Sequence, residues 1–486
     1  MQDYDKTSVA SIVSFAESLV GKSLSEVVDL PIEVDEARGK GKLGQLLEQY
    51  FFKISPPNNH EPDFPEAGLE LKTTGVVKGS RQTFLAKERL VLTNINFNTI
   101  HSEKWESSTL LAKCRLILLM FYLFERDVPE IDRRFVLEPT LLDLLSLSPS
   151  DLTQIISDWE FIRDKVVSKK AHEISEGDTT YLKACRKGSG GSDERLARQA
   201  NSEIRAQTRA FSFPASFISR HLKQGFPQAL PNSDEARPRT IIEETLNQDE
   251  VATAKIQKPR KATKKSIAVL PSLAPEANET VAEATQRRIS PFVGSTVHSI
   301  SEALGWTSKS KAFHSGLVKR MLTGTGSYPI ELEKAQIQLR TITLDSRGIP
   351  TENFSLPAFD YLELVTQDWT ESSFAEELET RYLLAVFAEE TPGVRRFATA
   401  GYWTMPFADR ENSREVWEET RARVRAGNFV LPKSGEHPIA FVNTHGRNSK
   451  DLVPTPQGGL ATRRSFWLNR YYIADVIQSQ LLERPS

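Results

Sequence analysis

The carboxylates of Asp63 and Glu70 and the ammonium group of Lys72 lie within one short stretch, residues 62–74, which reads PDFPEAGLELKTT. Two prolines flank Asp63 and exclude a helix there, whereas the residues from 68 onward alternate apolar and polar side chains, as a strand does. Glu70 and Lys72 are two positions apart, so a strand would place them on the same face. Asp63 can lean toward Glu70, and together they would form an oxygen-rich pocket suited to Mg2+.

Such a pocket has a chemical use. Hydrolysis of a phosphodiester requires charge stabilisation on the phosphoryl oxygens and a hydroxide-like nucleophile, and a carboxylate-bound divalent ion beside a lysine supplies both. The stretch therefore predicts a nuclease centre in which Asp63 and Glu70 hold the metal and Lys72 lies beside it. A solvated strand face is the alternative, because Asp followed by Glu-x-Lys is common in charged chains.

The composition of the chain sets wider limits. Its 486 residues, 39% of them hydrophobic, are enough for two or three domains. Lys and Arg total 62 against 64 Asp and Glu, so a nucleic-acid surface would have to be a local basic patch. The two cysteines are too few for a disulfide framework. We expect a soluble cytoplasmic protein without membrane contact, because no secretory signal is visible and the longest apolar run, residues 116–124, is too short to cross a bilayer.

A glycine-rich basic turn begins at Gly39 and leads into an amphipathic helix that continues to Phe51. Its glycines would let backbone amides approach phosphate groups, and its lysines could neutralise them. The candidate phosphate contacts are Lys40, Gly41 and Lys42. A flexible surface turn is the alternative.

Two strands are expected after the nuclease stretch, at residues 88–96 and at the apolar run 116–124. Lys113 lies just before the second of these strands, from where its ammonium could reach a site on a neighbouring strand. A lysine that extends from a partly buried segment to solvent is an equally good interpretation.

More cations gather at residues 181–191, where a short strand leads into a glycine-rich loop. The loop carries Lys183, Arg186 and Lys187. Because arginine can bind guanine edges in a bidentate manner, the pattern is typical of a DNA-reading loop. A solvated loop is again the alternative.

The second half of the chain repeats the order of the first. Residues 69–74 are echoed by residues 337–342, and the tryptophan motif at Trp105 is echoed at Trp369. Several matches in one order indicate a duplicated domain. We therefore expect two related domains, residues 1–230 and 280–486, joined by a basic, proline-containing linker at residues 231–279.

The two copies differ where the chemistry would be. Asp63, Glu70 and Lys72 correspond to Glu331, Gln338 and Arg340, and Lys113 aligns near Leu378 or Glu379. A neutral glutamine cannot replace a metal-binding carboxylate. The second copy is therefore expected to bind DNA without cutting it.

These residues resemble the family of the MutH mismatch-repair endonuclease and the Sau-three-A type of restriction enzyme, nucleases of one fold that act at GATC. The resemblance covers residues 39–51, 63–74, 105–115 and 181–188. It implies that Asp63 and Glu70 bind Mg2+ and that Lys72, Lys113 and Glu48 are also catalytic residues. It places DNA contacts at Lys40, Gly41 and Arg186 and, in the corresponding loop of the second copy, at His445, Arg447 and Lys450.

The expected fold is α/β (α+β, with mixed sheets), in two restriction-endonuclease-like domains of the PD-(D/E)xK type. The expected function is that of a type II, IIE-like restriction endonuclease. It would use Mg2+ to cut double-stranded DNA at GATC, and a second site bound to the inactive C-terminal copy would activate it. The chain would be a monomer that can dimerise or loop on DNA. The alternatives are a methyl-directed nicking endonuclease of mismatch repair, for which one domain suffices, and a non-catalytic DNA-binding regulator.

Overall fold

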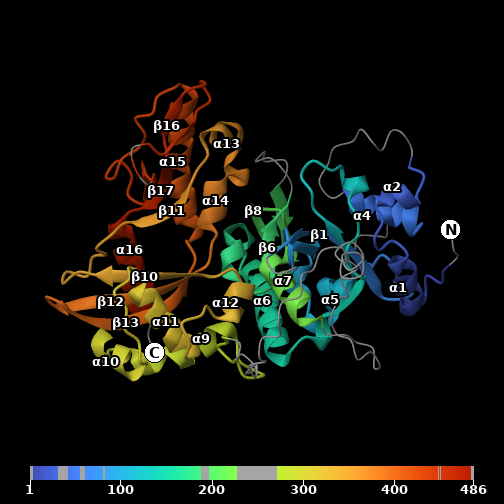
Figure 1. The fold of residues 1–486 in the computed structure, drawn as a ribbon, viewed down its shortest axis with the longest axis horizontal. Coiled ribbons are helices and arrows are strands. Elements are labelled where there is room, and N and C mark those ends of the chain that lie inside the picture. The colour runs from blue at the N-terminus through green and yellow to red at the C-terminus, as the bar shows by residue number, and fades with distance from the viewer. Residues whose placement is uncertain are drawn as a thin grey trace, which may run out of the picture. The chain divides into compact units, whose positions relative to one another are not determined.

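The computed structural model describes residues 4–30, 42–54, 61–79, 83–187, 196–226, 271–446, 448 and 450–482 (Figure 1). The chain forms two compact units, which are residues 1–163 with 210–270 and residues 164–209 with 271–486. The second unit thus includes segment 164–209, which lies in the first half of the sequence. Most of the expected linker lies outside the described residues, and its last part, 271–279, is described.

The first unit is built on a mixed sheet. Strand β1 (Leu69–Lys78) runs parallel to β4 (Leu116–Leu123), and β2 (Phe84–Ala86) and β5 (Thr140–Asp143) add antiparallel strands on either side, in the order β2-β1-β4-β5. The interior of β4 is buried throughout, as the continuous apolar run requires of a central strand covered on both faces. The two strands expected from the sequence at 88–96 and 116–124 are confirmed as β3 (Leu90–Asn94) and β4.

Helices cover this sheet. Apolar side chains of the N-terminal helices pack with those of β1 and β4 in one core. Ser8 caps the first of these helices by accepting a hydrogen bond from the Ser11 amide at 3.4 Å, which satisfies one of the amides left unpaired at a helix start. The helices are α1 (Val9–Glu17), α2 (Leu24–Val27), α4 (Lys42–Leu46) with the π-helical turn η1 (Leu47–Phe51), α5 (Thr109–Cys114), α6 (Pro149–Val167) and α7 (Ala215–Gln224). Strand β3 pairs with β9 (Arg209–Phe213).

The second unit contains a sheet of the same kind. Strand β10 (Gln338–Leu344) runs parallel to β12 (Tyr382–Thr391), which pairs with antiparallel β13 (Val394–Trp403). Another sheet has the order β11 (Phe354–Ala358), β17 (Arg464–Leu468), β14 (Ala440–Thr444). The remaining strands are β6 (Lys183–Arg186) and two hairpins, β7 (Leu196–Gln199) with β8 (Ser202–Gln207) and β15 (Leu452–Pro454) with β16 (Leu460–Thr462).

The second unit also contains α-helices. They are α9 (Val281–Ile289), α10 (Val297–Ala303), α11 (Phe313–Thr323), α12 (Ile330–Lys334), α13 (Tyr361–Thr366), α14 (Ser373–Leu378), α15 (Phe407–Arg425) and α16 (Arg470–Val476). The predicted mixed α/β fold class is confirmed. No helix in the described part of the chain is long and apolar enough to cross a membrane.

The echo between the two halves of the sequence is also an echo of local structure. Trp105 and Trp369 each begin a 3-10 turn, and the serine that follows each turn, Ser108 or Ser372, caps the next helix through its side chain. Before β1 and before β10, the residue two positions ahead of the Glu70 or Gln338 position has a positive φ. The residue is Gly68 in the first unit (φ 61°) and Gln336 in the second (φ 55°).

Candidate active site

The turn before β1 brings Asp63 back alongside the strand. The amide of Phe64 donates to the carbonyl of Leu69 at 2.9 Å, and the amide of Leu69 donates to the carbonyl of Phe64 at 3.2 Å. Closing so tight a turn needs a left-handed residue, which Gly68 supplies at φ 61°. Asp63 therefore reaches Glu70 although it is not on the same strand.

Asp63 and Glu70 are joined by reciprocal hydrogen bonds with the backbone. The Asp63 amide donates to Glu70 Oε2 at 3.1 Å, and the Leu71 amide donates to Asp63 Oδ2 at 2.8 Å. Asp63 is 7% exposed and Glu70 is fully buried. Two carboxylates are thus held in one buried corner at the start of β1.

Two lysines contact the Glu70 carboxylate. Lys72, two residues along β1, donates to Glu70 Oε1. Lys113 comes from α5, and its ammonium nitrogen lies 3.7 Å from the same Oε1 atom. Because Ser108 caps α5 and fixes its start, the helix delivers Lys113 to β1, which lies beside the strand that follows α5. The sequence-based interpretation of Lys113 as a group that reaches a neighbouring strand describes the geometry found.

Glu48 approaches the same centre from the π-helical turn η1. It is half-buried, and burial together with the charge of Asp63 raises the pKa of Glu48 to about 7. A carboxyl group in this range can gain or lose a proton near neutral pH.

The buried carboxylates of Asp63 and Glu70 would be stabilised by a bound cation. Burial raises the pKa of Glu70, the charge of Asp63 raises it further, and the contact with Lys72 opposes both effects. Carboxylates that are buried and close to one another are disfavoured in their charged forms unless a positive ion compensates them. The hard oxygen atoms of Asp63 and Glu70 fit Mg2+ for this reason.

The described residues contain no cluster of three or more His, Cys, Asp or Glu side chains that could enclose a metal. Mg2+ does not need one, because it commonly binds through one or two carboxylates and keeps water or phosphate oxygens as its other ligands. Two carboxylates such as those of Asp63 and Glu70 would therefore be enough for Mg2+ in the presence of a phosphate substrate.

Cys114 is a neighbour of the centre that sequence reasoning missed. It is fully buried, and burial raises the pKa of its thiol to about 12, so it remains protonated. Its position directly after Lys113 was the available signal. The thiol fills space beside Lys72 and Glu70 and brings no charge.

The residues expected to contact DNA are found in different surroundings. Lys40, Gly41 and Arg447 lie outside the described residues, and Lys42 begins α4. Lys183 is 7% exposed and donates to the Thr179 carbonyl at 2.5 Å, so its ammonium is directed into the protein. Lys187 is exposed. Arg186 forms an ion pair with Glu379, in which Nη2 lies 2.6 Å from Oε1. Of the second-copy candidates, His445 and Lys450 are both exposed.

In the second unit, the residues at the positions of Asp63 and Lys72 make different contacts. Glu331, at the position of Asp63, is 5% exposed, accepts a hydrogen bond from Ser272 and accepts another from the Leu273 amide at 2.9 Å. The guanidinium of Arg340 lies over the rings of Phe354 and Tyr382, at 5.1 and 5.8 Å. Neither side chain is placed as a metal ligand or a catalytic cation.

The counterpart of Lys113 is found by counting from the helix caps. Lys113 stands five residues after Ser108, and Glu377 stands five residues after Ser372. The sequence comparison pointed to Leu378 or Glu379 because the path from the capping serine to the strand residue that pairs with Glu70 or Gln338 is one residue longer in the second unit. Glu377 accepts a hydrogen bond from the Tyr382 hydroxyl at 2.6 Å. An acid thus stands where the first unit has a lysine.

The mixed α/β fold and this set of side chains resemble those of restriction-endonuclease-like nucleases. A family model described as the DNA mismatch repair enzyme MutH matches residues 52–158. Over 96% of its length the chain is 26% identical to the type II restriction enzyme Sau3AI of Staphylococcus aureus, 97% of which is covered. It is also similar to the DNA mismatch repair protein MutH of Vibrio cholerae, at 26% identity over 45% of this chain and 96% of that protein. The chain is 28% identical to the DNA mismatch repair protein MutH of Pectobacterium atrosepticum, over 44% of this chain and 92% of that protein. The resemblance predicted from the sequence is confirmed.

Proposed function

We propose that the protein is a type II restriction endonuclease that uses Mg2+ to cut both strands of DNA at GATC. The observation that carries the proposal is the convergence of Asp63, Glu70, Lys72 and Lys113 in one corner, in a chain that is similar to Sau3AI over nearly its whole length. MutH relatives match less than half of the chain, which favours restriction over mismatch repair.

Asp63 and Glu70 are the residues that would hold Mg2+. The bound ion would stabilise charge on the phosphoryl oxygens and activate water. Lys72 and Lys113, both in contact with Glu70 Oε1, place fixed positive charge where the scissile phosphate would bind, without reorganisation during the reaction. Glu48, with a pKa raised to about 7, can exchange a proton at its carboxyl oxygens.

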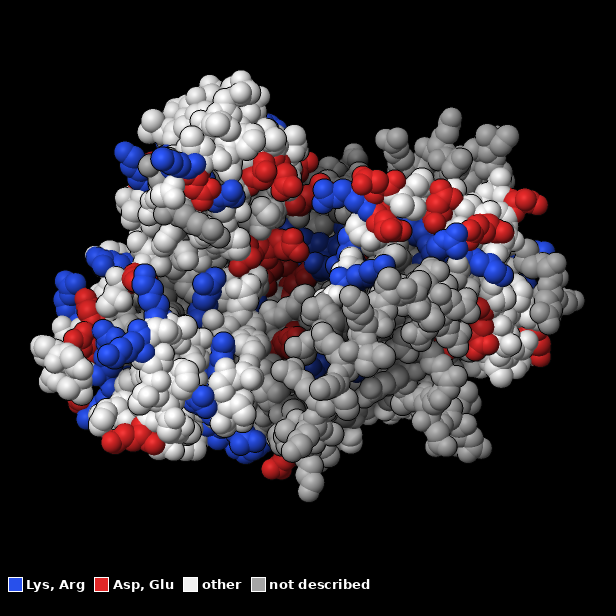
Figure 2. Space-filling model, viewed as in Figure 1, with Lys and Arg blue, Asp and Glu red and all other residues white. Residues whose placement is uncertain are grey.

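The proposal assigns catalysis to residues 1–230 and second-site binding to residues 280–486, with residues 231–279 as the linker. Glu331 and Arg340 are committed to other contacts, which supports a copy that does not cut. Exposed His445 and Lys450 are the candidate readers of the second site. Among the described residues drawn in Figure 2, basic and acidic side chains are interspersed, so DNA affinity would come from local groups such as these.

Binding of the second site would activate the first through tethering and coupling. Once one site is held, another on the same DNA is present at high effective concentration. Cleavage is then accelerated if the second site favours the competent state. The two free, buried cysteines, Cys114 and Cys185, accord with a reducing, cytoplasmic setting.

The test is cleavage of supercoiled plasmids that carry no, one or two GATC sites, with Mg2+ or with a chelator. We expect Mg2+-dependent linear products with ends that map to GATC, and faster cutting of the two-site plasmid. Dam-methylated plasmid in parallel shows the response to methylation. Nicked circles as the final product would indicate a mismatch-repair type of nickase. Specific binding without any cleavage would indicate a regulator.

A further inference from the structure

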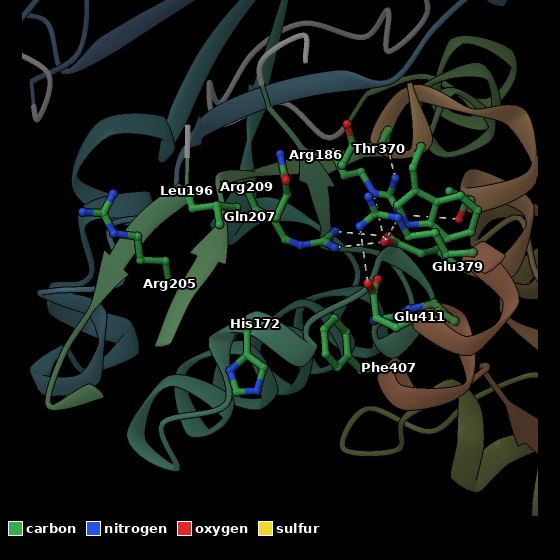
Figure 3. Close-up of a pocket in the computed structure, with 14 residues that line it drawn as sticks. His172, Arg186, Leu196, Arg205, Gln207, Arg209, Thr370, Glu379, Phe407 and Glu411 are labelled. Carbon is green, nitrogen blue, oxygen red and sulfur yellow. Dashed lines mark hydrogen bonds and ion pairs between the residues drawn. The ribbon is translucent and has the colours of Figure 1, made fainter. Parts of the chain in front are cut away.

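A cavity of about 230 Å3 lies within the second unit, and arginine side chains dominate its lining (Figure 3). One wall comes from segment 172–209 and the other from the C-terminal part of the chain. Besides His172, the ionisable residues of the lining are Arg186, Arg205, Arg209, Arg410, Arg414, Glu379 and Glu411. Positive charge therefore exceeds negative charge around this cavity.

Two arginines of segment 172–209, Arg186 and Arg209, converge on the carboxylate of Glu379, as Figure 3 shows. Arg186 donates to Glu379 Oε1 through Nε at 3.0 Å and through Nη2 at 2.6 Å. Arg209 donates to Oε2 at 3.1 Å and to Oε1 at 3.0 Å. Glu379 and Arg209 are each 4% exposed. Burial alone would raise the pKa of Glu379, but Arg209 and Arg186 outweigh burial and hold it far below its ordinary value.

Arg186 has little bonding capacity left. Besides its two bonds to Glu379, its guanidinium donates to the carbonyl of Thr370 at 2.6 Å and to that of Ala375 at 3.4 Å. The bidentate grip on a carboxylate uses the same pair of donors that arginine presents to a guanine edge or to a phosphate. Arg186 cannot bind Glu379 and a DNA base in this way at the same time.

The segment that carries Arg186 is held at further points. The Glu176 amide donates to Glu379 Oε2 at 2.9 Å, and the Thr404 hydroxyl donates to the Gly177 carbonyl at 2.8 Å. The contact at Gly177 is so close that a Cβ atom there would lie 2.3 Å from the Glu379 carbonyl oxygen and 2.6 Å from the Thr404 methyl group. A side chain at this glycine would therefore separate the two surfaces.

One candidate reader of the second site, His445, is connected to Glu379 indirectly, through two contacts and helix α14. His445 Nδ1 lies 2.9 Å from the Ser465 hydroxyl on β17. The next residue, Phe466, stacks on Phe374 of α14 with ring centroids 3.9 Å apart. Helix α14 ends at Leu378, immediately before Glu379. These contacts form the path by which a shift of β17 on binding DNA would displace α14 and, with it, Glu379.

We propose that Glu379 is an intramolecular ligand that occupies Arg186 in the resting enzyme, and that DNA bound at the second site releases Arg186 so that it can read the site to be cut. The inference rests on the proposed function, because it takes Arg186 as a reader of DNA. It adds an autoinhibitory contact, formed by Glu379, Arg186 and Arg209, that connects the two DNA sites.

Two variants of the full chain break this contact by different means. Glu379→Gln removes the charge, and Gly177→Ala wedges the two surfaces apart. Both should raise cleavage of a one-GATC plasmid on the order of tenfold, within the usual range of coupling between sites. Both should also lower the stimulation that a short GATC duplex gives when it is added in trans. Wild-type activity on two-site plasmids confirms the proposed function independently.

Matched controls separate release from general disturbance. Glu390→Gln removes the exposed partner of Arg396, and Gly326→Ala adds a methyl group whose nearest neighbour is 3.5 Å away. Neither should change the ratio of one-site to two-site cleavage. Circular dichroism and melting curves show which variants are folded.

The wild-type chain gives a measurement that does not depend on variant folding. Hydrogen exchange of peptides that cover residues 173–186 should become faster when the GATC duplex is added without Mg2+, because the Glu176 amide loses its acceptor. The proposal is overturned if these peptides keep or gain protection. It is equally overturned if folded Glu379→Gln or Gly177→Ala protein shows the wild-type ratio of one-site to two-site cleavage.

Discussion

Strand β1, which carries Glu70, and strand β10, which carries Gln338, each form a parallel pair with a neighbouring strand. The side-chain contacts around these two positions are different. Glu70 lies opposite Ile117 in a parallel pair, and Gln338 lies opposite Tyr382 in another. In the first unit two lysines meet a buried carboxylate, whereas in the second unit an arginine lies on aromatic rings. Two strands with the same parallel pairing therefore carry a charged, buried cluster in one unit and structural contacts in the other.

The sharpest test of this comparison replaces Glu70 in the first copy and Gln338 in the second. Glu70→Gln should lower Mg2+-dependent cleavage by about 10^3-fold or more, because the metal and both lysines lose their shared anion. Gln338→Ala should leave cleavage within about twofold of wild type, since this position has no part in catalysis. Initial rates on a two-site plasmid measure both. Substantial cutting by Glu70→Gln would refute the site.

A smaller effect is expected at the lysine and its acidic counterpart. Lys113→Ala should slow cleavage by about 10^2-fold through the loss of one preorganised charge. Glu377→Gln should leave the rate unchanged and cost about 1 kcal/mol of stability, the usual value of one hydrogen bond. Single-turnover rates and denaturant unfolding distinguish the two. Equal rate losses in both variants would contradict the assignment of catalysis to the first copy.

The pH dependence of stability should have opposite signs at two buried carboxylates. Glu70 has a raised pKa, so its ionisation destabilises the metal-free fold at neutral pH, and this effect disappears as the pH falls below the unfolded-state value near 4.5. Glu379 has a lowered pKa, so it contributes stability above about pH 4.5 that is lost on further acidification. Melting at pH 4 and pH 7 without metal should show Glu70→Gln stabilised and Glu379→Gln destabilised at pH 7. At pH 4 the Glu70 difference should nearly disappear, whereas most of the Glu379 difference should remain, because it is lost only as the pH falls through the lowered folded-state pKa.

A further comparison concerns the first carboxylate of each copy. Glu331→Gln should lower the stability of the second unit by about 1–3 kcal/mol, because the Ser272 hydroxyl and the Leu273 amide lose a charged acceptor. Asp63→Asn should abolish cutting and leave the melting temperature nearly unchanged, since relief of carboxylate repulsion offsets a weakened hydrogen bond. Calorimetry on both variants decides whether the two positions have exchanged catalysis for stability.

Local patterns predicted the centre well. Alternation identified β1 as a strand, and the flanking prolines excluded a helix at Asp63, where the structure has the turn that folds Asp63 back. The continuous apolar run identified β4, and the chain order put Lys113 next to it. These features depend on backbone sterics and on burial within a few residues, so one sequence is enough to find them.

Contacts between distant segments could not be predicted in the same way. Nothing near Arg186 in the sequence indicates that Glu379, far along the chain, would bind it. The burial of Lys183 was also missed, because its strand was taken for the start of an exposed loop. The correspondence between Lys113 and Glu377 was missed because a one-residue change in a connection is invisible without the cap positions.

The engagement of Glu331 with Ser272 and Leu273 has an evolutionary consequence. A carboxylate that now anchors the segment entering the second unit cannot return to metal binding unless that segment finds another attachment. Restoring Gln338 to glutamate would add a second buried charge and still leave Glu331 occupied. A metal site at this corner of the second unit would therefore require several simultaneous changes, so a single substitution would not create one.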